Sequence, residues 1–111
     1  MPQKTFRVFH CMVIAACVSF TSQVFAAEFT AAQKDKSFKP NNLKIKVGDS
    51  VDFRNDDSFF HNVFSLSDTK SFDLGSYPQG QSRKITFDKP GLVEIECSIH
   101  PEMTMKIEVT K

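Results

Sequence analysis

The chain has 111 residues, short enough for a single domain, and carries 14 Lys or Arg against 13 Asp or Glu, a formal net charge of +1. The charged side chains are scattered singly, without the basic stripe or cluster that contacts to phosphates require, which excludes a nucleic acid as the partner. Eight of the 12 phenylalanines follow residue 26, enough apolar surface for one compact core.

The N-terminal segment, residues 1–26, predicts a secretory signal peptide. Lys4 and Arg7 precede an uncharged, largely apolar stretch, and Val24-Phe25-Ala26 then places small residues where a signal peptidase cuts. We expect cleavage after Ala26, which leaves residues 27–111 as an exported domain in the periplasm.

Two other interpretations of this segment stay open. Val8 to Ala27 is twenty residues without a charge, about the span of a bilayer core, so an uncleaved membrane anchor is one alternative. A lipoprotein processing site at Cys17 is the other. Polar residues inside the stretch argue against the anchor. A soluble tether usually follows a lipidated cysteine, so the apolar Val18 and Phe20 after Cys17 argue against the lipoprotein site.

The domain 27–111 has no means of forming an internal disulfide. Removing Lys4 and Arg7 leaves 12 basic against 13 acidic residues, a net charge of about −1, and the one remaining cysteine is Cys97. Small exported domains often depend on disulfides for stability, and a bound metal is another source of it.

Alternating apolar residues predict short strands from Leu43 onward. Leu43, Ile45 and Val47 alternate with lysines, which is the period of a strand with one buried and one solvent-exposed face. A turn at 48–49 follows, then an alternating run over 51–53, a break at 55–57 and an extended run over 59–64. A loop rich in Ser, Asp and Gly is expected from there through Gly80.

The C-terminal third predicts three more strands. Ile85 and Phe87 mark one, which residues 88–91 end with Pro and Gly in turn positions. Side chains that share one face of the two following strands are Val93, Ile95 and Cys97, then Met103, Met105, Ile107 and Val109. No segment has a sustained helical period, so the expected fold class is all-β: a small antiparallel Greek-key sandwich of about six to eight strands.

Four side chains of the domain have the chemistry and spacing of a copper site. Cys97, His100 and Met103 form a C-x-x-H-x-x-M run, and His61 stands alone upstream. A copper ion that changes between Cu(I) and Cu(II) is typically held by two imidazoles and a thiolate, with a long, weak thioether bond on the axis. The expected strands place Cys97 at the end of one strand and Met103 at the start of the next, so a short loop supplies three ligands.

This ordered set resembles the cupredoxins, the small blue copper proteins, and especially their amicyanin and plastocyanin-like branch. The similarity rests on the Gly-Asp turn at 48–49, the His-Asn-Val segment at 61–63 and the loop 97–103, and it extends from about Asn42 to the end. It implies a type 1 site with one copper ion per monomeric chain, held by His61, Cys97, His100 and Met103. It also implies a hydrogen bond between the side chains of Asn62 and Ser98.

The axial methionine has two candidates. Met103 lies three residues after His100, the spacing of amicyanin-like proteins, whereas Met105 lies five after it, the spacing of plastocyanin. Aligning the last strand from Lys106 favours Met103 and leaves Met105 to fill the core, a role that suits its flexible thioether.

The resemblance implies a one-electron carrier and not an enzyme, with redox partners such as a c-type cytochrome or a dehydrogenase. Phe59 and Phe60 would form an apolar rim through which such a partner approaches, or one of them would pack in the core, since neighbours in a strand point opposite ways. Two other functions stay open: a copper-delivery protein that exchanges the metal without redox cycling, and an enzyme in which Cys97 is a thiol nucleophile paired with a histidine.

Overall fold

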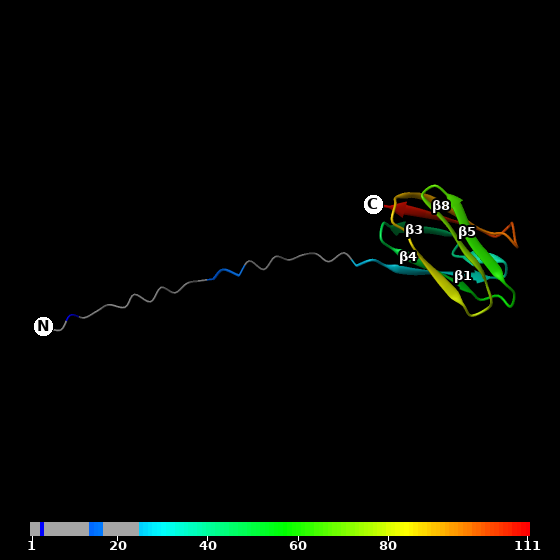
Figure 1. Cartoon of the computed structure of the whole chain (residues 1–111), viewed down its shortest axis with the longest axis horizontal. Helices are drawn as coiled ribbons and strands as arrows, with labels where there is room; N and C mark the ends of the chain where they lie inside the picture. The colour runs from blue at the N-terminus through cyan, green and yellow to red at the C-terminus, as the bar shows by residue number, and fades with distance from the viewer. Residues whose placement is uncertain (1–2, 4–13, 17–24) are drawn as a thin grey trace.

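The structure is a computed structural model that describes residue 3, residues 14–16 and residues 25–111 (Figure 1). The expected signal peptide, 1–26, lies almost entirely outside these residues, as do Cys17 and most of the alternative membrane anchor. Among the described residues, no helix has the length and apolar character to cross a bilayer.

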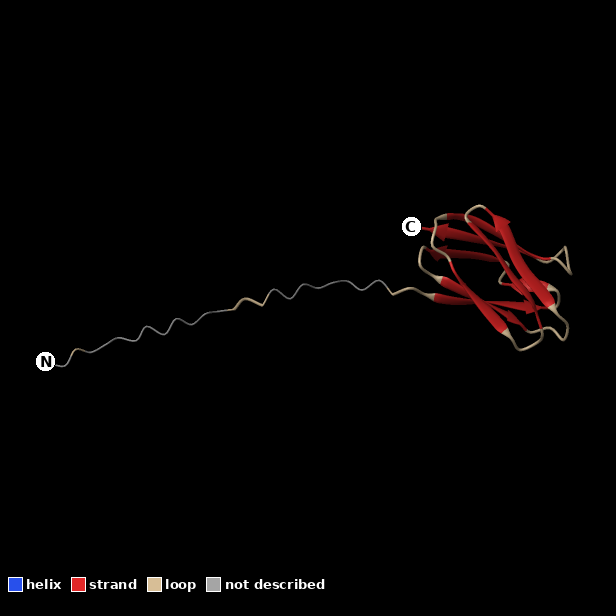
Figure 2. Cartoon of the chain, in the orientation of Figure 1, coloured by secondary structure: helices blue, strands red, loops and turns tan. Residues whose placement is uncertain are grey.

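Nine strands make up the described domain, and loops connect them without any helix (Figure 2). The strands are β1 (Glu28–Lys34), β2 (Ser37–Lys39), β3 (Asn42–Lys46), β4 (Ser50–Asn55), β5 (His61–Ser67), β6 (Lys70–Tyr77), β7 (Ser82–Thr86), β8 (Gly91–Cys97) and β9 (Thr104–Thr110). The all-β fold class expected from the sequence is confirmed, with nine strands among the described residues where six to eight were expected.

The strands form two sheets packed face to face. One sheet has the order β2-β1-β4-β7 and the other β3-β9-β8-β5-β6. Two pairs, β1 with β4 and β3 with β9, are parallel, so both sheets are mixed and not purely antiparallel as expected. Parallel neighbours need a crossover connection, which here carries the chain from one sheet to the other between β1 and β4 and again between β3 and β9.

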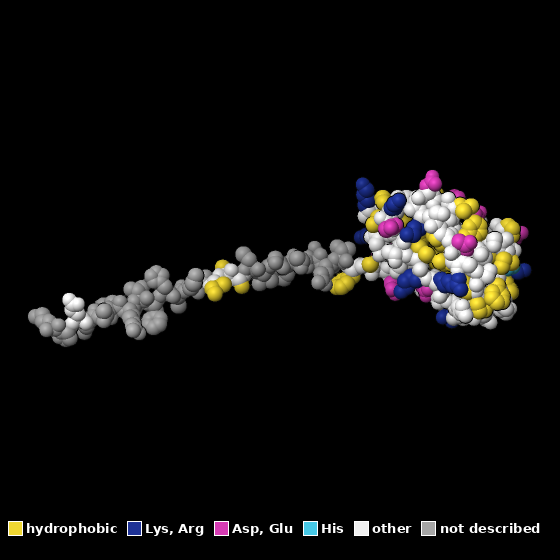
Figure 3. Space-filling model, in the orientation of Figure 1, with side chains coloured by type: hydrophobic (Ala, Val, Ile, Leu, Met, Phe, Trp, Pro, Cys, Tyr) yellow, Lys and Arg dark blue, Asp and Glu magenta, His cyan; other side chains and the backbone are white. Residues whose placement is uncertain are grey.

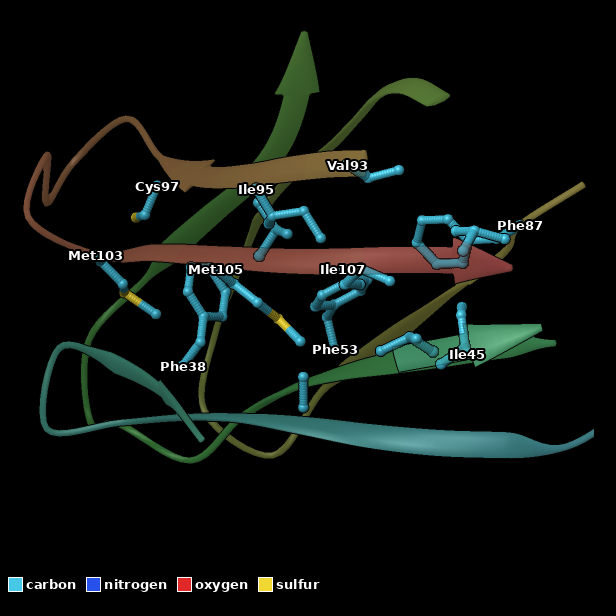
Figure 4. Close-up of a cluster of buried hydrophobic side chains, with 14 of the residues drawn as sticks. Phe38, Ile45, Phe53, Phe87, Val93, Ile95, Cys97, Met103, Met105 and Ile107 are labelled. Atoms are coloured by element: carbon cyan, nitrogen blue, oxygen red, sulfur yellow. The ribbon is translucent and has the colours of Figure 1, made fainter. Parts of the chain in front are cut away.

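The core lies between the sheets and is formed by every second residue of the strands (Figure 4). On β8 and at the start of β9 the alternation is regular, because Val93, Ile95, Cys97, Met105 and Ile107 all have 1% or less of their surface exposed. Val47 departs from its expected pattern, since β3 ends at Lys46 and the Val47 side chain is 40% exposed.

Strand β6 occupies a region where the composition predicted a loop, and that prediction was wrong. Residues Lys70–Tyr77 pair with β5 along the edge of the larger sheet. An edge strand buries few side chains, so Ser, Asp and Gly are tolerated there and weaken the strand signal. Phe72 and Leu74 pack against the core from this strand, and their alternation was the available sign of it.

Candidate metal centre

His61 opens β5 and is completely buried. Its side chain shares the inner face of the sheet with Val63 and Ser65, as the period-two geometry of a strand requires. The pairing with β6 shifts register between Asn62 and Phe64, an irregularity that strands often show beside functional residues. The ring nitrogen Nδ1 of His61 lies 3.7 Å from Sγ of Cys97.

Cys97 is the last residue of β8 and sits next to β5, in register with Val63. Its thiol is 1% exposed and lies 3.9 Å from Nδ1 of His100. Donor atoms of Cys97, His61 and His100 all lie within 4.8 Å of one another. The structure thus brings the distant histidine together with two residues of the C-x-x-H-x-x-M run.

The loop 98–103 is closed by two backbone hydrogen bonds. The amide of Met103 donates to the carbonyl of His100 at 2.9 Å, and the amide of Cys97 donates to the carbonyl of Met103 at 3.2 Å. These bonds bring Met103 back beside the end of β8, so Cys97 and Met103 occupy the same end of the core (Figure 4). His100 is only partly buried, so the candidate centre reaches the surface at this residue.

Met103 and Met105 are both buried, each with 1% of its surface exposed. Met103 directly precedes β9 and belongs to the loop that carries Cys97 and His100. Met105 lies within β9, in register with Ile95, and points into the middle of the core (Figure 4). The two methionines therefore differ in position: Met103 lies at the end of the core that carries Cys97, and Met105 lies further along β9, opposite Ile95 (Figure 4).

Asp57 is the residue of the centre that the sequence analysis missed. Its Oδ2 lies 2.6 Å from Nε2 of His61, and the carboxylate side chain is 5% exposed. Oδ1 also accepts the amide of Asp35 at 2.8 Å, and Oδ2 that of Lys36 at 3.1 Å. The available sign was an acid four residues before the lone histidine, in a segment interpreted only as a break between strands.

The environment of Asp57 keeps it ionised. Burial alone opposes the charge, but the hydrogen bonds from His61 and from the amides of Lys36 and Asp35 outweigh it and hold the pKa of Asp57 below its ordinary value of 3.8. A carboxylate at this position accepts a hydrogen bond from the Nε2–H group of His61. The lone pair of Nδ1 then faces the Cys97 thiol, which is the tautomer that a metal ligand needs.

The segment before His61 is held in place by Asn55, which is completely buried. Its Nδ2 donates to the carbonyls of Phe59 and Tyr77, both at 2.9 Å, and its Oδ1 accepts the amide of Asp57 at 2.9 Å. The turn between β1 and β2 approaches from the other side, with positive φ at both Asp35 and Lys36. Asp57 caps the two amides of that turn, so it joins the turn to the ligand segment.

The hydrogen bond implied between Asn62 and Ser98 is not among those of the described chain, and backbone pairing of β5 with β8 joins the two ligand segments instead. The rim expected at Phe59 and Phe60 is present: their exposed fractions are 37% and 55%. The Phe59 ring also packs on both histidines, with centroids 5.1 Å from His61 and 5.3 Å from His100.

The surface around His100 carries both apolar and charged side chains: Ile99 is 50% exposed, and Nζ of Lys36 lies 5.9 Å from the centroid of the Phe59 ring. A shallow pocket of about 220 Å³ is lined by Lys36, Ile99, His100, Pro101 and Glu102. In the space-filling view, hydrophobic side chains are visible at this end of the domain among charged ones, and charged groups are spread over the whole visible face (Figure 3).

The donor set fits copper. One buried thiol and two imidazole nitrogens converge, and a thioether lies at the same end of the core, which together are the soft and borderline donors that copper prefers in redox sites. A hard cation such as Mg²⁺ or Ca²⁺ prefers oxygen ligands, and the one carboxylate nearby is already paired with His61.

Comparisons with known proteins agree with this chemistry. Residues 25–110 match the profile of the copper binding proteins of the plastocyanin/azurin family. Methylamine utilization protein MauL of Methylorubrum extorquens is 27% identical over 108 residues, which cover 96% of this chain and 95% of the relative.

Solved structures with the same fold include two kinds of copper protein. The Cu-containing nitrite reductase NirK from Thermus scotoductus SA-01 superposes with a TM-score of 0.71 at 30% identity, over 80% of this chain and 23% of the reductase. This chain thus spans about a quarter of the reductase. A reduced amicyanin variant superposes with a TM-score of 0.67 at 25% identity, over 74% of this chain and 81% of amicyanin.

Proposed function

Since the chain belongs to the plastocyanin/azurin family of copper-binding proteins, we propose that it is a one-electron carrier whose copper ion is held by His61, Cys97, His100 and Met103. The observation that carries the proposal is the convergence of His61 from β5 with Cys97 and His100 from the C-terminal loop, all donor atoms within 4.8 Å. Copper supplies a one-electron change between Cu(I) and Cu(II) when it is bound.

The burial of the donors supports transfer of electrons and not binding of a substrate. The side chains of His61, Cys97 and Met103 are each 1% exposed or less, so solvent and small molecules do not contact them directly. Of the four proposed ligands, only His100 reaches the surface, where Phe60 and Ile99 are also exposed. An electron would therefore leave through the His100 edge, with Cys97 as the ligand most strongly coupled to the metal.

Met103 is the proposed axial ligand in preference to Met105. Met103 lies on the loop that also carries Cys97 and His100, whereas Met105 packs opposite Ile95 in the core. The thioether of Met103 would complete a four-ligand set.

The domain is proposed to act after export, as residues 27–111 in the periplasm with the leader 1–26 removed. The redox partners would be proteins such as a c-type cytochrome or a dehydrogenase. The name of the MauL relative refers to methylamine utilization, which is compatible with a dehydrogenase as the electron donor. The exposed Phe60 and Ile99 would give a partner an apolar contact at this end of the domain, with Lys36 and Glu102 as charged neighbours.

One equivalent of Cu(II) added to the purified chain tests the proposal. We expect an intense blue colour from the thiolate, a narrow copper hyperfine splitting in the electron paramagnetic resonance spectrum, and reversible bleaching by a one-electron reductant. Cys97→Ser is the matched control and should give a colourless product. A colourless unmutated chain would reject the proposal.

Exchange kinetics separate the carrier from a copper-delivery protein. A carrier should keep its metal through repeated reduction and reoxidation in the presence of a Cu(I) chelator at equal concentration. Rapid loss of Cu(I) to the chelator, with no change in the fold, would favour delivery.

A further inference from the structure

The residue after the expected cleavage site is bound by the domain through both of its backbone polar groups. The amide nitrogen of Ala27 donates to Oδ1 of Asp49 at 2.8 Å, and its carbonyl accepts the amide of Ser50 at 3.0 Å. Strand β1 begins one residue later. This contact lies at the end of the domain where the chain terminates, away from the metal loop (Figure 1).

Asp49 presents a fixed, charged carboxylate to Ala27. The side chain is largely buried, with 7% of the residue exposed, and Oδ2 accepts the amide of Lys46 at 2.8 Å. Hydrogen bonds from the amides of Lys46 and Ala27 lower the pKa of Asp49, so the group is anionic at neutral pH.

No side chain in the described residues forms a salt bridge with this carboxylate. The five ion pairs of 25–111 involve other acids, and the neighbouring Glu28 is already bound to Lys84 at 2.6 Å. Lys44, Lys46 and Lys111 line the cavity of about 820 Å³ beside Asp49 without an ion pair to it. The charge of Lys46 acts on this carboxylate only from beyond ion-pair distance, so a cation that touches it, as the nitrogen of Ala27 does, would complete the pairing that a buried carboxylate usually has.

Removal of the leader would create that cation at the atom already in contact. Hydrolysis of the 26–27 peptide bond by an exported peptidase breaks the C–N bond and adds water: the oxygen stays on the new carboxylate of Ala26. The nitrogen of Ala27 becomes an amine that is protonated at neutral pH, since an α-amino group has an ordinary pKa of about 8.

We propose that Asp49 is the receptor for the α-ammonium group of Ala27, so that processing after Ala26 completes a salt bridge that pins the start of β1 to the turn before β4. This inference rests on the proposed export of the domain and is independent of the metal. The amide hydrogen bond at 2.8 Å becomes a charge-assisted one, which is stronger than its neutral counterpart.

The contact with Asp49 also distinguishes cleavage at 26–27 from cleavage one residue earlier or later. A chain that keeps Ala26 presents only the neutral amide of Ala27 to Asp49, and a chain that loses Ala27 places its ammonium about 3.8 Å further along the strand, the distance between successive Cα atoms. Only cleavage at 26–27 puts the charge against the carboxylate. Phe25 is 82% exposed and contributes only to the lining of the cavity beside Asp49, so its removal costs little packing.

The test begins with the full chain, exported from its own leader and purified. Intact mass should give Ala27 as the first residue. Because every strand and core side chain described lies within 28–110, the processed chain retains the complete fold. Two forms of 27–111 are then compared, one with a free amino group and one N-acetylated. The acetylated form keeps the N–H donor to Asp49 and loses only the charge.

Urea unfolding of the two forms gives the result. We expect the folding equilibrium constant of the free-amine form to be about two- to fivefold larger, the range of a solvent-accessible ion pair. The difference should vanish in Asp49→Asn, persist in the exposed control Asp68→Asn, and shrink in about 1 M salt, where charges are screened beyond about 3 Å.

Equal stability of the free and acetylated forms would overturn the inference, as would a difference that survives in Asp49→Asn or a first residue other than Ala27. Should Asp49→Asn fail to fold, the acetylation and salt comparisons in the unmutated chain still decide. The visible spectrum of the same copper-loaded samples tests the metal proposal separately, so either idea can fail without the other.

Discussion

The carboxylate of Asp57 and the imidazole of His61 form a buried pair, with Oδ2 2.6 Å from Nε2. The same carboxylate holds the two amides of the β1–β2 turn, so it cannot rotate away without breaking three hydrogen bonds. The pair fixes both the tautomer of His61 and the direction of Nδ1, which faces Cys97.

Replacing Asp57 by Asn should weaken copper binding. The amide has nearly the same volume but lacks the negative charge that holds the Nε2 proton, so we expect an affinity loss of about 10- to 100-fold. Titration against a competing chelator measures it. Asp56→Asn is the matched control, since Asp56 is more exposed and pairs with Arg54. Equal affinities in the two variants would contradict a positioning role for Asp57.

Single leucine substitutions at the two buried methionines should separate the axial ligand from the core residue. Both replacements conserve volume and should cost about 1 kcal/mol of unfolding free energy or less in the metal-free chain. Met103→Leu should also shift the visible spectrum and raise the reduction potential, because Cu(II) loses a donor. Met105→Leu should leave both unchanged. The reverse pattern would assign the ligand to Met105.

Tyr77 should make the domain sensitive to alkali. Burial raises the pKa of Tyr77 from 10.0 to about 12, against the opposing hydrogen bond from Gln33. A pKa that is raised in the folded state favours folding below pH 10, and this contribution, about 3 kcal/mol, is lost as the pH rises from 10 to 12.

The chain has one tyrosine and no tryptophan, so the ultraviolet absorbance of tyrosinate reports this ionisation directly. Tyr77→Phe should remove the alkaline dependence between pH 10 and 12. It should also cost about 1–3 kcal/mol at neutral pH, because the Phe53 carbonyl loses the hydroxyl that donates to it at 2.7 Å. A tyrosinate transition near pH 10 in the folded protein would contradict the prediction.

An acidic residue in the apolar rim should slow electron transfer between two copies of the chain. Phe60→Asp places like charges face to face when two rims meet, and we expect the self-exchange rate between Cu(I) and Cu(II) forms to fall about tenfold at low salt. Nuclear magnetic resonance line widths measure the rate. Leu66→Asp is the control, since Leu66 is 77% exposed near the other end of β5. An equal fall in both variants would argue against the rim as the contact surface.

Strand patterns and ligand spacing were largely predictable because both are local in sequence. The alternation over 93–97 and 103–109 gave the inward faces correctly, and the C-x-x-H-x-x-M run placed three donors on one short loop. The meeting of His61 with Cys97 was inferred from ligand chemistry and from the resemblance to the cupredoxins, and the register of Val63 with Cys97 shows how the fold achieves it.

The features that sequence reasoning missed are those set by tertiary contacts. Asp57 lies in a segment with no periodic pattern, and its role appears only when the β1–β2 turn is packed against it. Strand β6 lacks apolar alternation along much of its length because it lies at a sheet edge. The parallel pairing of β1 with β4 leaves no local mark, since strand direction depends on how the connections cross between sheets.

The loop that carries Cys97 and His100 lies at one end of the sandwich, and the start of β1 and the C-terminus lie at the other (Figure 1). A fusion partner, a surface linker or an electrode attachment placed at residue 27 or after Lys111 would therefore leave the His100 face pointing outward. Immobilised copies would all be oriented alike, with the edge proposed to exchange electrons directed toward the solution.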